Sequence, residues 1–295
     1  MRIVTDSAAD LTPDDLRAWG IDRVPLMINF PQGEVSSEDI DADAFYNRLL
    51  AMAPDAPTTS QPAPATFLEK YQAANGEPIL SIHVSSGLSG TINAAKVAAG
   101  QTSGVTVIDS GTLSPAQRFQ VLAAAMAIKA GWPVERITER LNQMRHASEA
   151  IFTLETLHYL ARGGRIGRVQ ALAGSLLQIK PIIRVDEADG KYSTVAKART
   201  MGQAFGSIAS YLKTRYADQP VWVTVIHGQR AEKAEELRAL LTAELNVGKS
   251  DMIRISPVLG VHTGPGVIGA GVVPLELVAD LLPQAEGTAI PAAAL

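Results

Sequence analysis

Hydrophobic and polar positions follow two alternating patterns along this chain. Short apolar runs rich in β-branched residues predict buried strands, and each is followed by a segment in which apolar residues recur every three or four positions, which predicts a helix. The expected strands lie at 2–4, 24–28, 79–84, 105–108, 221–226 and 252–255, and the longer expected helices at 41–52, 91–99, 115–129, 134–145, 201–216 and 231–245. Strands that alternate with helices predict an α/β fold, with a largely parallel sheet in the first half.

The pattern changes after Ala150. A basic, Gly-rich stretch, ARGGRIGR, precedes a helix expected over 169–178, and the next segment predicts a β-hairpin that turns at Asp189 and Gly190. A chain of 295 residues is long enough for two domains. We therefore predict an N-terminal α/β domain over 1–150, a C-terminal α/β domain over 151–283, and a mobile tail over 284–295 that lacks periodicity.

Composition excludes several classes of function. The chain has 26 basic and 30 acidic residues, so it has no general electrostatic footprint for nucleic acid. No apolar run approaches the roughly 18 residues that span a bilayer, which argues against stable membrane insertion. The chain has no cysteine, and its histidines lack the spacing of metal ligands, so we expect no disulfide and no metal in a protein of the reducing cytoplasm.

A hydroxyl-rich turn follows the strand expected at 79–84. The segment SIHVSSGLSGTINAAK places Ser86, Ser89, Gly90 and Thr91 between that strand and an Ala-rich helix. Backbone N–H groups at a helix start and flanking hydroxyls bind anions, and open α/β sheets bind ligands at the carboxyl ends of their strands. The turn matches neither a Walker loop nor a dinucleotide fingerprint, which leaves phosphate and carboxylate as candidates. The alternative interpretation is that Ser89 only caps the helix.

Two further segments carry candidate chemistry. GVHTGPGVIGAG (residues 260–271) predicts a tight loop that brings His262 and Thr263 beside backbone donors, although a single histidine is more often structural. TTSQPAP places Thr59 in a Pro-restricted loop, where a helix cap is the simpler explanation.

Basic side chains gather in two stretches of the second half. They include Arg165, Arg168 and Arg199. The ordinary explanation is a charged face exposed to solvent. The more specific functional explanation is a docking patch for a partner protein.

Taken in order, several of these segments resemble the DegV family, bacterial fatty-acid-binding proteins also called FakB. The matching segments are IVTDSAADL, VPL, TSQPAP, VSSGLSGT, VIDS, LARGGRIG, KPIIRV, KART and HTGPG, which together span nearly the whole chain.

The resemblance implies a two-domain α/β protein that encloses a long-chain fatty acid between its domains and presents it to a separate ATP-dependent fatty acid kinase. Thr59, the turn from Ser89 through Gly90 to Thr91, and the nearby His262 and Thr263 would hold the carboxylate, with Ser86 as a further candidate. Arg165, Arg168 and Arg199 would face the kinase. On this basis the protein has no catalytic residue and no cofactor of its own, and its hydroxyls would bind the carboxylate without a nearby arginine or lysine.

Two other classes remain open from the residues alone. The chain could be an enzyme that acts on a small phosphorylated or carboxylated metabolite, with His262 as the acid or base and the hydroxyl-rich turn as the anion site. A ligand-responsive regulator is disfavoured, because no helix-turn-helix with a basic recognition face is present.

Overall fold

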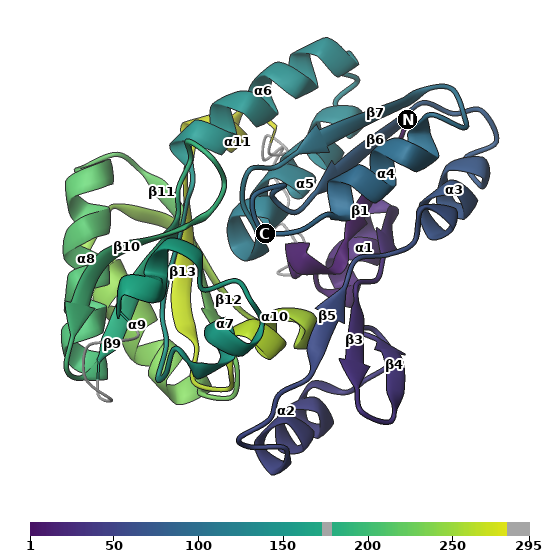
Figure 1. Cartoon of the computed structure of the whole chain (residues 1–295). Helices are drawn as coiled ribbons and strands as arrows, with labels where there is room; N and C mark the ends of the chain where they lie inside the picture. The colour runs from purple at the N-terminus through teal and green to yellow at the C-terminus, as the bar shows by residue number, and fades with distance from the viewer. Residues whose placement is uncertain (173–178, 282–295) are drawn as a thin grey trace.

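The computed structural model describes residues 1–172 and 179–281, and its first half contains a parallel sheet. Four strands lie in the order β2-β1-β6-β7, and every neighbouring pair is parallel (Figure 1). The bounds are β1 Arg2–Asp6, β2 Ile21–Val24, β6 Ile79–His83 and β7 Val105–Asp109. The parallel sheet expected for the first half is therefore confirmed.

Helices separate these strands as the apolar periodicity predicts. The first begins with a capping box, in which Thr12 and Asp15 satisfy each other's backbone N–H groups, and with a proline at its first position. The helices of this half are α1 Pro13–Trp19, α2 Ala42–Ala51, α3 Pro64–Gln72, α4 Thr91–Ala99, α5 Ser114–Lys129 and α6 Val134–Ala147, with the 3₁₀ turn η1 at Ser7–Ala9.

A second, six-stranded sheet occupies the other half. Its order is β10-β9-β8-β13-β11-β12, and all neighbours are antiparallel except β11 and β12. The bounds are β8 Glu149–Thr153, β9 Lys180–Val185, β10 Tyr192–Ala198, β11 Val221–His227, β12 Val247–Arg254 and β13 Ile268–Pro274. The pairing of β9 with β10 confirms the expected hairpin. The division of the chain near residue 150 stays a prediction.

The helices of the second half begin with α7 and end with α11. Their bounds are α7 His158–Arg162, η2 Gly167–Leu172, α8 Met201–Tyr216, α9 Ala231–Glu244, α10 Pro257–Thr263 and α11 Glu276–Ala279. The helix expected over 169–178 corresponds to η2 only as far as residue 172, and the rest of it, like the expected tail over 284–295, lies outside the described residues. No helix among the described residues is long and apolar enough to span a bilayer.

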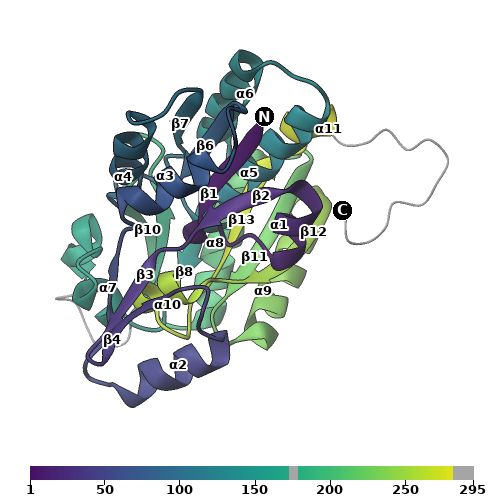
Figure 2. The ribbon, with the colours of Figure 1, turned by 90° about the vertical axis from the view of Figure 1, so that its right-hand side faces the viewer.

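A small antiparallel sheet, β4-β3-β5, corrects two predictions. The strand expected at 24–28 is divided at Pro25, which lacks a donor, into the end of β2 and the start of β3 (Met27–Phe30). The loop expected at TTSQPAP contains a short strand, β5 (Thr58–Ser60), which pairs with β3, while β4 (Gly33–Ser36) forms the other edge. This sheet and α2 lie at the opposite end of the molecule from α6 (Figures 1 and 2).

Helix α5 joins the parallel sheet to the six-stranded one. It contacts β1 and β6 on one side and β8, β11 and β13 on the other. Phe119 on α5 packs against Trp222 on β11, with ring centroids 4.8 Å apart. Arg118 on the same helix is buried and bonds both Asp15 of α1 (3.0 Å) and Asp251 of β12 (2.9 Å). One continuous core therefore links the two large sheets.

Candidate functional site

Thr59 and His262, which are 203 positions apart in the sequence, form a direct hydrogen bond. Thr59 lies on β5 and His262 lies in the last turn of α10, and Thr59 Oγ1 is 2.8 Å from His262 Nε2. The two side chains meet because α10 packs against β3 and β5. The structure thus brings together two of the residues predicted to bind an anion.

The tight turn expected in segment 260–271 is present but short, at residues 264–267. Residues up to Thr263 belong to α10, and β13 begins at Ile268 and is buried along its whole length. Gly260, within α10, serves close packing. A Cβ atom added at Gly260 would lie 2.7 Å from Phe45 Cε1 and 2.8 Å from Tyr46 Oη, so the absence of a side chain lets α10 lie directly on α2.

The hydroxyl-rich turn forms the other side of the site. Ser89 Oγ lies 2.8 Å from Thr91 Oγ1 and accepts the Thr91 N–H at 3.3 Å. Gly90 is the N-cap residue of α4, and no side chain caps that helix. A Cβ added at Gly90 would lie 1.9 Å from Gln61 Oε1, so this glycine allows the TTSQPAP segment to lie against the turn.

Ser89, Thr59 and His262 line one pocket together with Arg165. The guanidinium of Arg165 is held by two carbonyls, because Nη1 donates to Gly163 O at 2.8 Å and Nε donates to Leu88 O at 3.4 Å. The expectation of an anion site without a nearby cation is therefore wrong. Sequence spacing offered no signal for this convergence, because Arg165 reaches the pocket only through the fold.

The rest of the pocket wall is apolar, apart from the hydroxyl of Tyr192. These residues are Ala8, Leu26, Val84, Leu88, Leu113, Tyr192, Val258 and Leu259. The cavity between these walls has a volume of about 40 Å³. The site therefore combines a polar cluster with a closely packed apolar lining.

His262 is neutral at physiological pH. Burial and, to a smaller extent, the nearby Arg165 guanidinium together lower its pKa from 6.5 to about 4. Its Nδ1 atom is buried and has no hydrogen-bond partner among the described residues. The positive charge of the site therefore comes from Arg165, and the imidazole contributes a polar contact without charge.

Other predicted site residues point elsewhere. Ser86 is exposed, and its N–H donates to Asp109 Oδ1 at 3.2 Å. Thr263 Oγ1 donates to the Leu259 carbonyl at 3.0 Å within its own helix. Neither side chain lines the pocket. Ser85 is buried, and its hydroxyl ties the turn to the β9–β10 hairpin by donating to Gly190 O at 2.8 Å.

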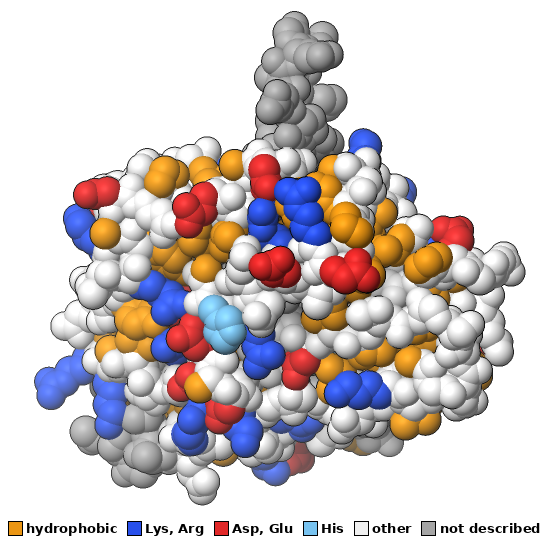
Figure 3. Space-filling view, turned by 90° about the horizontal axis from the view of Figure 1, so that it is seen from above, with side chains coloured by type: hydrophobic (Ala, Val, Ile, Leu, Met, Phe, Trp, Pro, Cys, Tyr) orange, Lys and Arg blue, Asp and Glu red, His pale blue; other side chains and the backbone are white. Residues whose placement is uncertain are grey.

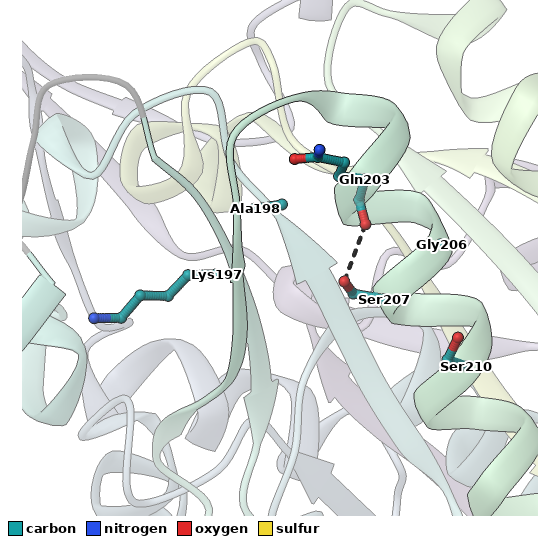
Figure 4. A pocket seen from close by; sticks show the side chains of 6 residues that line it. All are labelled: Lys197, Ala198, Gln203, Gly206, Ser207 and Ser210. Atoms are coloured by element: carbon teal, nitrogen blue, oxygen red, sulfur yellow. Dashed lines mark hydrogen bonds between the residues drawn. The ribbon is translucent and has the colours of Figure 1, made fainter.

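The remaining predicted docking residues lie on the surface near β10. Arg168 pairs with Asp189 at 2.9 Å, and Arg199 is exposed just before α8. A shallow, open surface depression lies between β10 and α8. In Figure 4 the Lys197 side chain extends away from α8, and Ser207 donates to the carbonyl of Gln203 on the helix. Basic and acidic side chains are interspersed on the face seen in Figure 3.

A buried polar chain elsewhere has the residue types of a hydrolytic triad. Asp6 Oδ2 lies 3.0 Å from His83 Nδ1, and His83 Nε2 lies 2.6 Å from Ser81 Oγ. All three residues are fully buried, and Ser81 is also bonded to the Tyr71 hydroxyl at 2.8 Å. No substrate can reach this serine, so the chain of bonds stabilises the parallel sheet. Within the described part of the chain, no cluster of three potential metal-ligating side chains occurs.

The fold and the site define a class of α/β protein in which a polar cluster adjoins an apolar pocket between sheets. The family model described as "Uncharacterised protein, DegV family" matches residues 1–275. A DegV domain-containing protein of Deinococcus radiodurans is 36% identical over 277 residues, which cover 92% of this chain and 95% of that protein. The chain belongs to the DegV family.

Solved structures of the family agree with this assignment. A DegV family protein from Thermus thermophilus, described by its fatty acid binding, matches with a TM-score of 0.87 at 30% identity and covers 93% of this chain and 100% of its own. A stearic-acid-binding protein from Eubacterium ventriosum matches with a TM-score of 0.83 at 26% identity and covers 93% of this chain and 98% of its own. Both of these structural neighbours are described as binding fatty acids.

Proposed function

We propose that this protein binds a long-chain fatty acid and presents it to a separate ATP-dependent fatty acid kinase, which forms the acyl phosphate. The observation that carries the proposal is that Thr59, Ser89, His262 and Arg165 line one pocket whose other walls are largely apolar. Hydroxyl and guanidinium donors suit a carboxylate, and the apolar wall suits an alkyl tail.

The energetics favour the tail as the source of affinity. Burial of an alkyl chain gains about 0.8 kcal/mol per CH₂, so a chain of about 16 carbons has on the order of 12 kcal/mol available before ordering costs. The carboxylate must lose water, and hydrogen bonds to a charged group, at about 1.5–3 kcal/mol each, offset that loss. The head group therefore fixes orientation and the tail supplies affinity.

The first test is direct extraction. Purified, untagged protein is extracted with organic solvent, and any co-purified acid is identified by mass spectrometry. A stoichiometric long-chain acid supports the proposal. Protein that carries no acid and takes up none when it is added would contradict it and favour the small-metabolite enzyme, in which His262 acts as the acid or base.

Head-group variants test the site itself. Thr59→Val and Ser89→Ala each remove one donor to a charged group, so each is expected to weaken fatty acid affinity about 10- to 100-fold in a fluorescent displacement assay. Ser86→Ala is the matched control, because Ser86 is exposed and does not line the pocket. Equal loss in the control, or no loss in either site variant, would contradict this assignment.

The kinase step is tested with a variant expected to change phosphorylation of the bound acid by the kinase but not the affinity for the fatty acid. Arg199→Glu reverses an exposed charge outside the pocket, so it is expected to slow acyl phosphate formation by the kinase at least about fivefold and leave fatty acid affinity unchanged. Arg17→Glu on α1 reverses another exposed charge and serves as the control. Unchanged transfer with Arg199→Glu would remove this residue from the docking surface.

A further inference from the structure

Asp10 is a buried carboxylate that joins two helices from different parts of the chain. It follows η1 and is only 5% exposed. Its Oδ1 accepts the backbone N–H of Ser256, the N-cap residue of α10, at 2.8 Å, and its Oδ2 accepts the hydroxyl of Ser114, the first residue of α5. One carboxylate thus holds the starts of both helices.

The backbone around this contact is in an uncommon conformation. Asp10 has φ 50° and Ser114 has φ 52°, and both are non-glycine residues in the left-handed region. Such conformations persist where the surrounding structure requires them, and they concentrate at functional sites.

The carboxylate also lacks a close cation. The charged or titratable groups that face it are Arg23 of β2 and Tyr46 of α2, and Arg254 lies beyond Tyr46. Arg23 itself bonds Glu38 and the Leu11 carbonyl. Burial raises the pKa of Asp10 from 3.8 to about 6 in spite of the two hydrogen bonds. The fold therefore retains an ionisable group where a neutral one would be easier to bury.

Helix α10 connects Asp10 to the ligand site. Its N-cap is bonded to Asp10, and its last turn carries His262, which bonds Thr59. The helix has only seven residues and packs on η1, α2, β3, β5 and α7. A shift of its first turn therefore moves the imidazole relative to β5.

We propose that Asp10 is a positioning residue for fatty acid binding, whose carboxylate fixes the first turn of α10 and so keeps His262 in contact with Thr59. This inference rests on the proposed function. A neutral residue at this position bonds the Ser256 N–H more weakly than a carboxylate does, and the loosened helix lowers affinity for the acid.

The test compares wild-type protein with Asp10→Asn, whose amide can still accept from Ser256 and donate to Ser114. We expect about fivefold weaker affinity for a fluorescent fatty acid at pH 7.5 and a variant-to-wild-type ratio near one at pH 5, where Asp10 of the wild type is protonated. The ratio cancels the ionisation of the fatty acid itself. A ratio that does not change with pH, or that stays at one throughout, overturns the proposal.

A measurement without ligand keeps this inference separate from the proposed function. Hydrogen exchange of the α10 amides is expected to be about fivefold faster in Asp10→Asn, and the His262 ring resonances are expected to shift. Glu149→Gln, which alters another buried carboxylate, is the control and should change neither readout. Unchanged α10 exchange in Asp10→Asn overturns the proposal, whether or not the protein binds fatty acid.

A second variant tests the same hydrogen bond if Asp10→Asn fails to fold. Ser256 has φ −62° and precedes Pro257, so Ser256→Pro fits the backbone and removes the N–H that Asp10 accepts, together with the buried serine hydroxyl. It is expected to reproduce the faster α10 exchange and the His262 shift. Wild-type values for both would contradict the role of this hydrogen bond.

Discussion

At the scale of single residues, the space around His262 is set by a glycine on another helix. A Cβ added at Gly163 would lie 2.0 Å from His262 Nδ1 and 2.7 Å from its Cε1. Gly163 has an ordinary helical conformation (φ −74°), so its backbone alone would accept alanine. The position is glycine because the imidazole occupies the place of a side chain.

Gly163→Ala is therefore a prediction about the site. The methyl group must displace the imidazole and break its 2.8 Å contact with Thr59, so we expect about tenfold weaker fatty acid binding. The assay is displacement of a fluorescent fatty acid. Gly100→Ala is the matched control, because Gly100 is also a helical C-cap glycine with φ −67° and has room for a Cβ. Unchanged binding in Gly163→Ala would show that His262 does not depend on this packing.

Single residues also show the limit of sequence reasoning at this site. Thr59, Ser89 and His262 were predicted from hydroxyl-rich or Gly-rich segments and from the family resemblance, and the structure places all three at one pocket. Arg165 was predicted, from its basic stretch and from the family resemblance, to face a partner kinase, and not to line this pocket. Its neighbours in the pocket come from three distant segments. The local sequence pattern carries no information about contacts between segments so far apart.

At the scale of elements, β13 shows why a central strand can resemble a loop in the sequence. Gly264, Gly266, Gly269 and Gly271 suggested a turn-rich segment, but only the first two lie in a turn, and Gly269 and Gly271 lie within β13. In the fold, β13 pairs with both β8 and β11, and a Cβ added at Gly271 would lie 2.5 Å from Pro115 Cβ of α5. The strand needs glycine because α5 lies directly on it, and a tertiary contact of this kind is not visible in local periodicity. The strands and helices with clear apolar periodicity, such as β11 and α8, were predicted correctly.

Gly271→Ala tests this explanation. Overpacking between β13 and α5 is expected to lower the free energy of unfolding by about 1–3 kcal/mol, measured by urea denaturation. Gly202→Ala on α8 is the control, because nothing lies within 4 Å of a Cβ there and alanine favours a helix by about 1 kcal/mol. If Gly271→Ala were as stable as wild type, close packing of α5 would not explain the glycine.

At the scale of the whole molecule, the pKa values of two buried groups in the α10 region are shifted in opposite directions. Burial raises the pKa of Asp10 to about 6 and lowers the pKa of His262 to about 4. Between about pH 4 and 6 the folded protein binds more protons at Asp10 than the unfolded chain does, so this contribution to stability falls as pH rises. At His262 the unfolded chain binds more protons between about pH 4 and 6.5, so that contribution rises with pH.

The two contributions are similar in size and largely cancel in the wild type. A pKa difference of about two units corresponds to about 3 kcal/mol for each group. Removing one group should therefore expose the slope of the other. From pH 4 to pH 7, the free energy of unfolding of Asp10→Asn minus that of wild type should rise by up to about 3 kcal/mol, and the same difference for His262→Gln should fall by a similar amount. The weaker bond to Ser256 in Asp10→Asn is a separate effect, which acts on α10 within the folded state.

Urea denaturation at half-unit pH steps measures both differences. Because each variant is compared with wild type at the same pH, titration of all other carboxylates cancels. Opposite slopes of the two differences against pH would show that Asp10 and His262 are both buried in environments that favour their neutral forms. Their effects on the pH dependence of stability would then largely cancel in the wild type. Parallel or flat differences would mean that one of the two groups is solvated in solution. If the solvated group were His262, its imidazole would not be part of the buried wall of the pocket that Thr59 and Ser89 also line.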